Sequence, residues 1–328
     1  MKTYLVIGSH CFTGAHIVDA LLERPDNRVI GVSRSPEYKD CFLPYRRRQT
    51  PAFEFHQVDM VRRFDRLQAV LESERPSVVI NVAALSEVAL SNESPVEYFD
   101  INTKAVVRLC NYLRTTSYLE RYIHISSAEI FGACSAPVTE EALFNPSTPY
   151  AVSKASADQY LNVLLRNFGF PVTIIRSTNV YGKHQQLFKI IPRTVINLKL
   201  KKTIELHGGG KAIKSFIHIR DVVRGLMLAL ERGESETFHF SVSDGQTVAD
   251  VVEKICTSMG FEFRACTRVV GERLGQDAGY RLDCSKASGT LGWQPEIRFE
   301  EGVQEVIGWV NDEWKEILEQ PMEYQHRL

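Results

Sequence analysis

Short runs of β-branched and aromatic residues alternate with longer amphipathic stretches over the first 180 residues. The short runs predict strands at residues 3–7, 29–32, 53–58, 77–82, 122–126 and 172–176. Apolar positions at helical spacing predict helices that end near Leu22 and that span residues 64–71, 96–113 and 150–168. Continuously apolar strands that alternate with helices are typical of a parallel sheet covered on both faces. The predicted fold class is therefore α/β, a Rossmann-type doubly wound parallel sheet.

The alternation weakens after residue 180. A basic stretch at 199–202 and a glycine triplet at 208–210 precede a further helix predicted at 248–259. We interpret residues 1–180 as one domain and 181–328 mainly as a smaller, mixed α/β C-terminal lobe, with residues near 215–240 returning to the first domain.

Composition narrows the class of protein. The chain has 328 residues, 44% of them hydrophobic, and carries 39 basic against 40 acidic side chains. This balance excludes disordered, collagen-like and coiled-coil chains, and no apolar run reaches the ~18 residues that a membrane span needs. A net charge of −1 argues against nucleic acid or an anionic membrane as the main partner. Seven scattered cysteines without a C-x-x-C pair, and no signal-peptide pattern, predict reduced thiols, no metal and a cytoplasmic location.

A glycine-bearing turn follows the first strand. Gly8 and Gly14 occupy the first and third glycine positions of a dinucleotide-binding turn, but Cys11 stands at the middle one. We expect Gly8, Cys11, Phe12, Thr13 and Gly14 to hold a pyrophosphate, with Cys11 either displacing it or turning its side chain away. The alternative is an ordinary strand-to-helix turn.

The second strand ends in Ser33-Arg34. NAD-specific sites usually place a carboxylate here for the ribose 2′-hydroxyl, whereas an arginine favours a 2′-phosphate. The pair therefore favours NADP over NAD, although Arg34 could equally be a solvated loop charge.

Tyr150 is followed four residues later by Lys154, on one face of a predicted helix. The lysine charge would favour the phenolate and make Tyr150 an acid/base group usable near neutral pH. Ser127 ends the preceding strand, so all three side chains should meet at the carboxyl edge of the sheet.

At this point the sequence resembles the extended short-chain dehydrogenase/reductase superfamily, in its nucleotide-sugar epimerase/dehydratase branch. The likeness covers nearly the whole chain. The motifs that carry it are Gly8 and Gly14, residues 59–60, 81–84, Asn102, 126–132, 149–154, 176–182, 216–221, 273–277 and 291–295.

The resemblance implies further binding residues. Asp59, Met60, Ala83, Ala84 and Asn102 are expected around the cofactor, with Ser33, Arg34, Tyr150 and Lys154. Ser86, Asn179, Lys189, Lys214 and Arg273 are expected around a nucleotide-diphosphate sugar. The first domain would hold the dinucleotide and the C-terminal lobe the nucleotide sugar. Relatives pair through the helices at 96–113 and 150–168, which implies a homodimer, with Val163, Leu164 and Phe168 available at the interface.

The resemblance also implies the chemistry. Tyr150 would take the C4 hydroxyl proton of the sugar, Ser127 would bind the C4 oxygen, and Lys154 would hold the nicotinamide ribose and tune Tyr150. Glu129 matches the base of 4,6-dehydratases, whereas Ala128 replaces an acid and Glu87 replaces a histidine. The leading hypothesis is thus a 4,6-dehydratase that forms a 4-keto-6-deoxy sugar. The alternatives are a C4 epimerase, a decarboxylase, a 4-keto reductase and a catalytically silent dinucleotide-binding protein.

Overall fold

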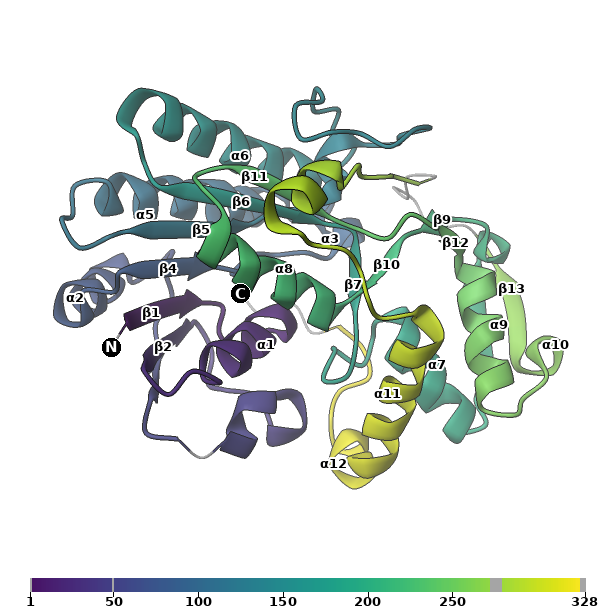
Figure 1. Ribbon diagram of the computed structural model, residues 1–328. Coiled ribbons are helices and arrows are strands. Elements are labelled where there is room, and N and C mark those ends of the chain that lie inside the picture. The colour runs from purple at the N-terminus through teal and green to yellow at the C-terminus, as the bar shows by residue number, and fades with distance from the viewer. Residues whose placement is uncertain (1, 49, 272–278, 325–328) are drawn as a thin grey trace.

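The centre of the molecule is a seven-stranded parallel sheet (Figure 1). This computed structural model describes residues 2–48, 50–271 and 279–324. The strand order is β3-β2-β1-β4-β5-β6-β11. The bounds are β1 Lys2–Ile7, β2 Asn27–Ser33, β3 Phe53–Gln57, β4 Val78–Asn81, β5 Arg121–Ile125, β6 Val172–Ser177 and β11 Thr237–Phe240. The predicted doubly wound sheet is confirmed, and the later strand β11 lies beside β6.

The strand order reverses between β1 and β4. Ile7 at the end of β1 pairs with Val32 of β2 on one side and with Asn81 of β4 on the other. Because the chain leaves these strands in opposite directions, their carboxyl ends open a crevice, which is where doubly wound sheets bind ligands.

Helices cover both faces of the sheet. One face is covered by α1 (Phe12–Leu21) and α8 (Ile219–Arg232), whose side chains share a core with β1 and β4. The other face is covered by α2 (Phe64–Glu74), α5 (Ala105–Leu113) and α6 (Pro149–Phe168). Full coverage explains why most of the strands read as continuous apolar runs.

The helix expected at 96–113 is interrupted. It consists of α4 (Pro95–Phe99), a π-helical turn η3 (Asp100–Lys104) and α5. The π turn carries Asn102, which is fully buried. The periodicity of the apolar positions predicted one continuous helix and did not show this π-helical turn.

The remaining elements form the lobe on the right of Figure 1 and the loops around the sheet. The helices α7 (Ile190–Lys199), α9 (Val248–Ser258) and α11 (Phe299–Asp312) of this lobe bury a separate apolar core, which includes Val195, Val252 and Val306. The bounds of these elements are η1 Asp40–Phe42, η2 Pro44–Arg48, α3 Val88–Ser91, η4 Ala128–Phe131, β7 Asn179–Tyr181, α7 Ile190–Lys199, β8 Ile204–His207, η5 Gly208–Gly210, β9 Ile213–Lys214, β10 Phe216–His218, β12 Gln246–Thr247, α9 Val248–Ser258, α10 Phe263–Cys266, β13 Thr267–Val270, η6 Ala287–Leu291, α11 Phe299–Asp312 and α12 Trp314–Leu318. Within the described residues, none of the helices combines the length and the apolar character that crossing a bilayer requires.

Candidate active site

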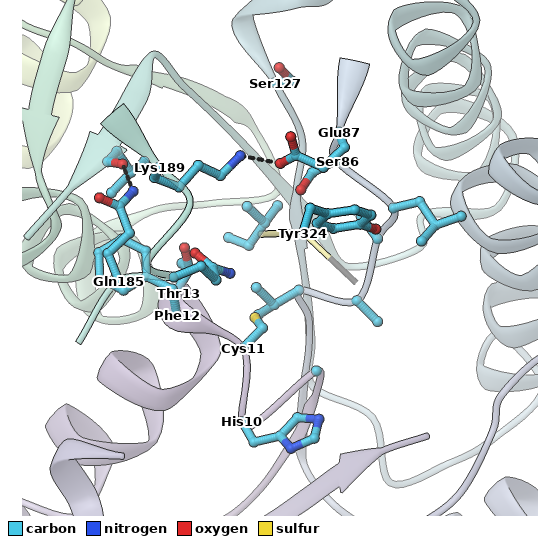
Figure 2. Close-up of a pocket in the computed structure, with 18 of the residues that line it drawn as sticks. His10, Cys11, Phe12, Thr13, Ser86, Glu87, Ser127, Gln185, Lys189 and Tyr324 are labelled. Atoms are coloured by element: carbon cyan, nitrogen blue, oxygen red, sulfur yellow. Dashed lines mark hydrogen bonds and ion pairs between the residues drawn. The ribbon is translucent and has the colours of Figure 1, made fainter. Parts of the chain in front are cut away.

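A cavity of about 530 Å³ opens at the carboxyl edge of the sheet, where the strand order reverses. Its wall combines residues that follow β1, β2, β4, β5 and β6 with residues from the C-terminal lobe (Figure 2). The predicted site residues that line it are Gly8, Cys11, Phe12, Thr13, Ser33, Arg34, Asp59, Met60, Ala83, Ala84, Ser86, Ser127, Glu129, Tyr150, Lys154, Asn179 and Lys189.

The turn after β1 is as tight as its glycines suggest. Gly8 has a φ of +86°, and an added Cβ would lie 2.8 Å from the backbone nitrogen of Ala83. A Cβ on Gly14 would lie 2.1 Å from the carbonyl oxygen of Gly8. Cys11 adopts an extended conformation, and its Sγ accepts a hydrogen bond from the Gly14 N–H at 3.4 Å. The thiol thus caps helix α1, and burial raises its pKa to about 11.

The end of β2 forms one end of the cavity. Ser33 is buried, and its hydroxyl has no hydrogen-bond partner among the residues that the structure describes. Arg34 and Ser35 follow it in the wall. Sequence reasoning missed His10 and Tyr38, whose rings stack here with centroids 4.4 Å apart. The position of His10 inside the glycine turn was a signal in the sequence that it could line the cavity. No such signal marks Tyr38.

Other expected cofactor residues shape the wall in different ways. The Asp59 carboxylate accepts hydrogen bonds from the Val61 and Arg62 N–H groups, which fixes the turn after β3. Asn102 does not reach the wall. It is fully buried, and its amide donates to the Leu85 carbonyl and accepts from the Leu85 N–H. Asn102 therefore holds the loop after β4 from behind, which corrects the expectation that it lines the cofactor site.

Ser127 and Tyr150 meet at the wall beyond β5. Burial, followed by the negative charge of Glu129, raises the pKa of Tyr150 above its usual value, while a hydrogen bond with the Ser127 hydroxyl lowers it. The Ser127 hydroxyl also accepts a hydrogen bond from the Glu129 N–H at 3.2 Å, so it caps the short helix η4. This geometry brings a serine, a tyrosine and a carboxylate together.

The hydrogen bonds of Lys154, which is predicted to hold the nicotinamide ribose and to tune Tyr150, are made with β5. Its Nζ donates to the Ile125 carbonyl at 2.7 Å and lies 3.3 Å from Nε2 of His124. Burial lowers the pKa of Lys154 to about 8. The lysine lines the cavity but directs these two contacts into the protein, and the raised pKa of Tyr150 means that its hydroxyl is protonated at neutral pH.

Ala128 is fully buried in an apolar cluster with Ile130 and Phe131. It is absent from the cavity wall among the described residues. The position that resembles the acid of dehydratases therefore provides neither a proton donor nor room for one.

The loops of the two lobes meet across the cavity. Lys189 forms an ion pair with Glu87, as Figure 2 shows beside Ser127 and Ser86. Asn179 lies in the wall, where its amide oxygen accepts from the Tyr280 hydroxyl at 2.7 Å. Lys214 stands outside the wall, with its Nζ 4.8 Å from the centre of the Tyr280 ring. Arg273 lies outside the described residues.

A C-terminal segment that sequence reasoning missed completes the wall. Residues 320–324 contribute Gln320, Pro321, Glu323 and Tyr324. Glu323 pairs with Arg193 at 2.8 Å, and the Tyr324 ring packs edge-on against Phe188. Figure 2 places Tyr324 between Glu87 and Cys11. No motif marks this segment, because its place depends on tertiary contacts alone.

The residues present fit a dinucleotide. Gly8 and Gly14 leave space where a side chain would strike the backbone, and the N-terminus of α1 faces the cavity. The buried Ser33 hydroxyl offers a partner for a polar ligand at one end. Lys154 offers a charged donor at the other end of the cavity.

The model of the NAD dependent epimerase/dehydratase family matches residues 4–242. The chain belongs to this family. It is 28% identical over 331 residues to dTDP-glucose 4,6-dehydratase of Haemophilus influenzae, an alignment that covers 94% of this chain and 98% of the relative.

Solved structures agree with this assignment. DesIV, a dTDP-glucose 4,6-dehydratase from Streptomyces venezuelae with NAD and TYD bound, is 27% identical with a TM-score of 0.85, and the match covers 95% of this chain and 97% of DesIV. A UDP-glucuronic acid 4-epimerase from Bacillus cereus, in complex with UDP-glucuronic acid and NAD, has a TM-score of 0.85 at 24% identity, over 95% of this chain and 99% of the epimerase. The second likeness supports the fold alone.

Proposed function

We propose that this protein is a nucleotide-sugar 4,6-dehydratase that uses NAD or NADP. The observation that carries the proposal is the Glu129 carboxylate beside the Ser127–Tyr150 pair, in a cavity whose opposite wall fits a dinucleotide. The dehydratases among its relatives support the same reaction.

In this mechanism the side chains handle protons. Tyr150 takes the proton of the sugar C4 hydroxyl, and Ser127 donates a hydrogen bond to the C4 oxygen. A bound oxidised nicotinamide, held by the glycine turn, the end of β2 and Lys154, would supply a hydride acceptor for C4 and then a hydride donor for C6, and its positive charge would favour the Tyr150 phenolate. Glu129 then removes the C5 proton, which is acidified by the adjacent C4 ketone. The C6 hydroxyl leaves as water after it receives a proton from Glu129.

The two parts of the cavity bind different ligands in our proposal. Residues 1–180, with the segment near 215–240, hold the dinucleotide in our proposal, and residues 181–328 mainly hold the nucleotide sugar. Lys189, Asn179 and Ser86 line the sugar end and can bind diphosphate and hydroxyl groups. Lys214 and Arg273 stay predictions for the same diphosphate.

NADP is our proposed preference within this site. A 2′-phosphate would find the Arg34 guanidinium and the Ser33 and Ser35 hydroxyls in the wall, with no acidic side chain at the end of β2 to repel it.

We also propose a cytoplasmic homodimer. Val96, Phe99 and Val152, on α4 and α6, are exposed, and so are Val163 and Phe168 farther along α6. Leu164, which the sequence had suggested for this interface, is buried in the core instead. Two such helices from each of two copies would cover these apolar side chains.

A C4 epimerase is the second candidate, and the observation that favours it is Ala128. Because its side chain points into an apolar cluster, Glu129 has no neighbouring acid at that position to protonate the departing hydroxyl. An epimerase needs the Ser127–Tyr150 pair but no carboxylate.

The experiment is Glu129→Gln compared with Glu141→Gln, which changes an exposed glutamate outside the cavity wall. With the correct nucleotide sugar, Glu129→Gln should still reduce the bound cofactor and then stall before losing water. Glu141→Gln should behave like the wild type. Product formation by Glu129→Gln at the wild-type rate would favour the epimerase.

A further inference from the structure

A row of buried titratable groups leads from Lys154 into the core. His124 of β5 lies with Nε2 at 3.3 Å from the Lys154 Nζ and at 4.0 Å from Oδ1 of Asp158. All three side chains are almost completely buried. One nitrogen of the imidazole therefore faces both an ammonium group and a carboxylate.

Asp158 is itself held in place. Its Oδ2 accepts from Nε of Arg176 on β6 at 2.9 Å, while Oδ1 has no hydrogen-bond partner among the described residues. Arg176 in turn donates from Nη1 to the Glu140 carbonyl at 3.0 Å, and its guanidinium lies over the rings of Phe131 and Phe144. The carboxylate therefore cannot turn away from His124 without leaving a buried arginine unpaired.

His124 is neutral in this position. Burial, and then the positive charges of Lys154 and Arg176, hold the pKa of His124 well below its usual range. A neutral imidazole that faces an ammonium group through Nε2 accepts a hydrogen bond there and carries its proton on Nδ1.

We propose that His124 and Asp158 are positioning residues that fix the Lys154 ammonium from inside the core, so that its remaining N–H points toward the cavity. Ile125 and His124 accept two of its three N–H groups, and the Asp158 carboxylate supplies the buried negative charge. This role rests on the proposed function, in which Lys154 offers the dinucleotide a charged donor at the cavity wall.

The charges around Lys154 give this arrangement a pH dependence. The charged and titratable groups around it are His124 from β5, Asp158 from its own helix, and Arg176 from β6. Tyr150 and Glu129 line the same cavity as Lys154. Burial lowers the pKa of Lys154 to about 8, and Asp158 opposes this by raising it. Loss of Asp158 should therefore release the Lys154 proton at a lower pH.

The test is a pH titration of Lys154 in the purified protein. NMR of lysine labelled with ¹³C at Cε monitors the titration, and the Lys154→Arg variant assigns the Lys154 signal. The wild-type midpoint should lie near pH 8. Asp158→Asn should lower it by about one pH unit, a tenfold increase in the acid dissociation constant. The control Glu140→Gln removes a buried negative charge at the far end of the row and should leave the midpoint unchanged.

A second pair of variants keeps the Asp158–Arg176 ion pair and so guards against unfolding. His124→Phe should lower the Lys154 midpoint, because it removes an acceptor, and His124→Gln should restore it. If the Asp158→Asn and His124→Phe proteins are both folded and neither substitution changes the Lys154 midpoint, the proposal is overturned. No substrate is needed, so failure here is distinct from failure of the dehydratase assignment, where the protein would titrate as expected but form no product.

Discussion

Gly8→Ala should be far more costly than an ordinary glycine substitution. Gly8 has a φ of +86°, a conformation in which a Cβ costs about 1–2 kcal/mol. The added carbon would also lie 2.8 Å from the Ala83 nitrogen and 3.1 Å from its Cα. That nitrogen donates to the Ile7 carbonyl at 3.0 Å, so it cannot retreat without breaking a contact between β1 and the loop after β4.

Gly169 provides a matched control. Its φ is +63°, but a Cβ there would meet no atom of the described residues within 4 Å. Both substitutions share the conformational cost and the reduced freedom of the unfolded chain, so their difference isolates the collision. Overpacking costs ~1–3 kcal/mol, which gives a total loss of about 2–5 kcal/mol at Gly8 and about 1–2 kcal/mol at Gly169.

Urea denaturation followed by circular dichroism measures both losses, and calorimetry measures NADP affinity. We expect Gly8→Ala to lose the larger share of unfolding free energy and to bind NADP more weakly, since the displaced turn is the proposed pyrophosphate site. Equal losses at Gly8 and Gly169, with unchanged NADP binding, would refute the packing argument and this use of the turn.

Three further predictions concern the chemistry, the cofactor and the assembly. Tyr150→Phe keeps the ring but removes the acid/base hydroxyl, so turnover should fall by ~10²-fold or more in steady-state assays. Tyr160→Phe, on the same helix, should keep full turnover. Near-normal activity of the Tyr150→Phe enzyme would refute the assignment. Arg34→Ala should weaken NADP much more than NAD in fluorescence titrations, and equal effects on both would contradict the NADP preference. Light scattering should show a dimer that Phe168→Asp weakens, because the Phe168 ring is 60% exposed on the proposed interface. A wild-type monomer at micromolar concentration would disprove the proposed dimer.

Hydrophobic patterning predicted the sheet well because most of its strands are buried on both faces. The same pattern did not show the π turn at Asn102. The role of the Asn102 amide in holding the loop after β4 becomes visible only when the structure brings Leu85 beside it. Tyr150 and Lys154 were found by their spacing, but spacing did not show the contacts of Lys154 with Ile125 and His124. Those contacts depend on His124, which reads as an ordinary strand residue.

The cavity wall was predicted where glycine or strand-end motifs mark it. Tyr324 and Tyr38 were missed because each reaches the wall through tertiary packing, against Phe188 in the first case and His10 in the second. At Ala128, the sequence showed that alanine stands where related dehydratases have an acid. It did not show the apolar cluster that Ala128 joins.

The most direct test of the dehydratase account is mass spectrometry of the products formed from a panel of nucleotide sugars in deuterated water. If Glu129 removes the C5 proton, one sugar of the panel should lose water and carry deuterium from the solvent at C5. An unchanged mass with inverted configuration at C4, or a dehydrated product without deuterium at C5, would contradict the account.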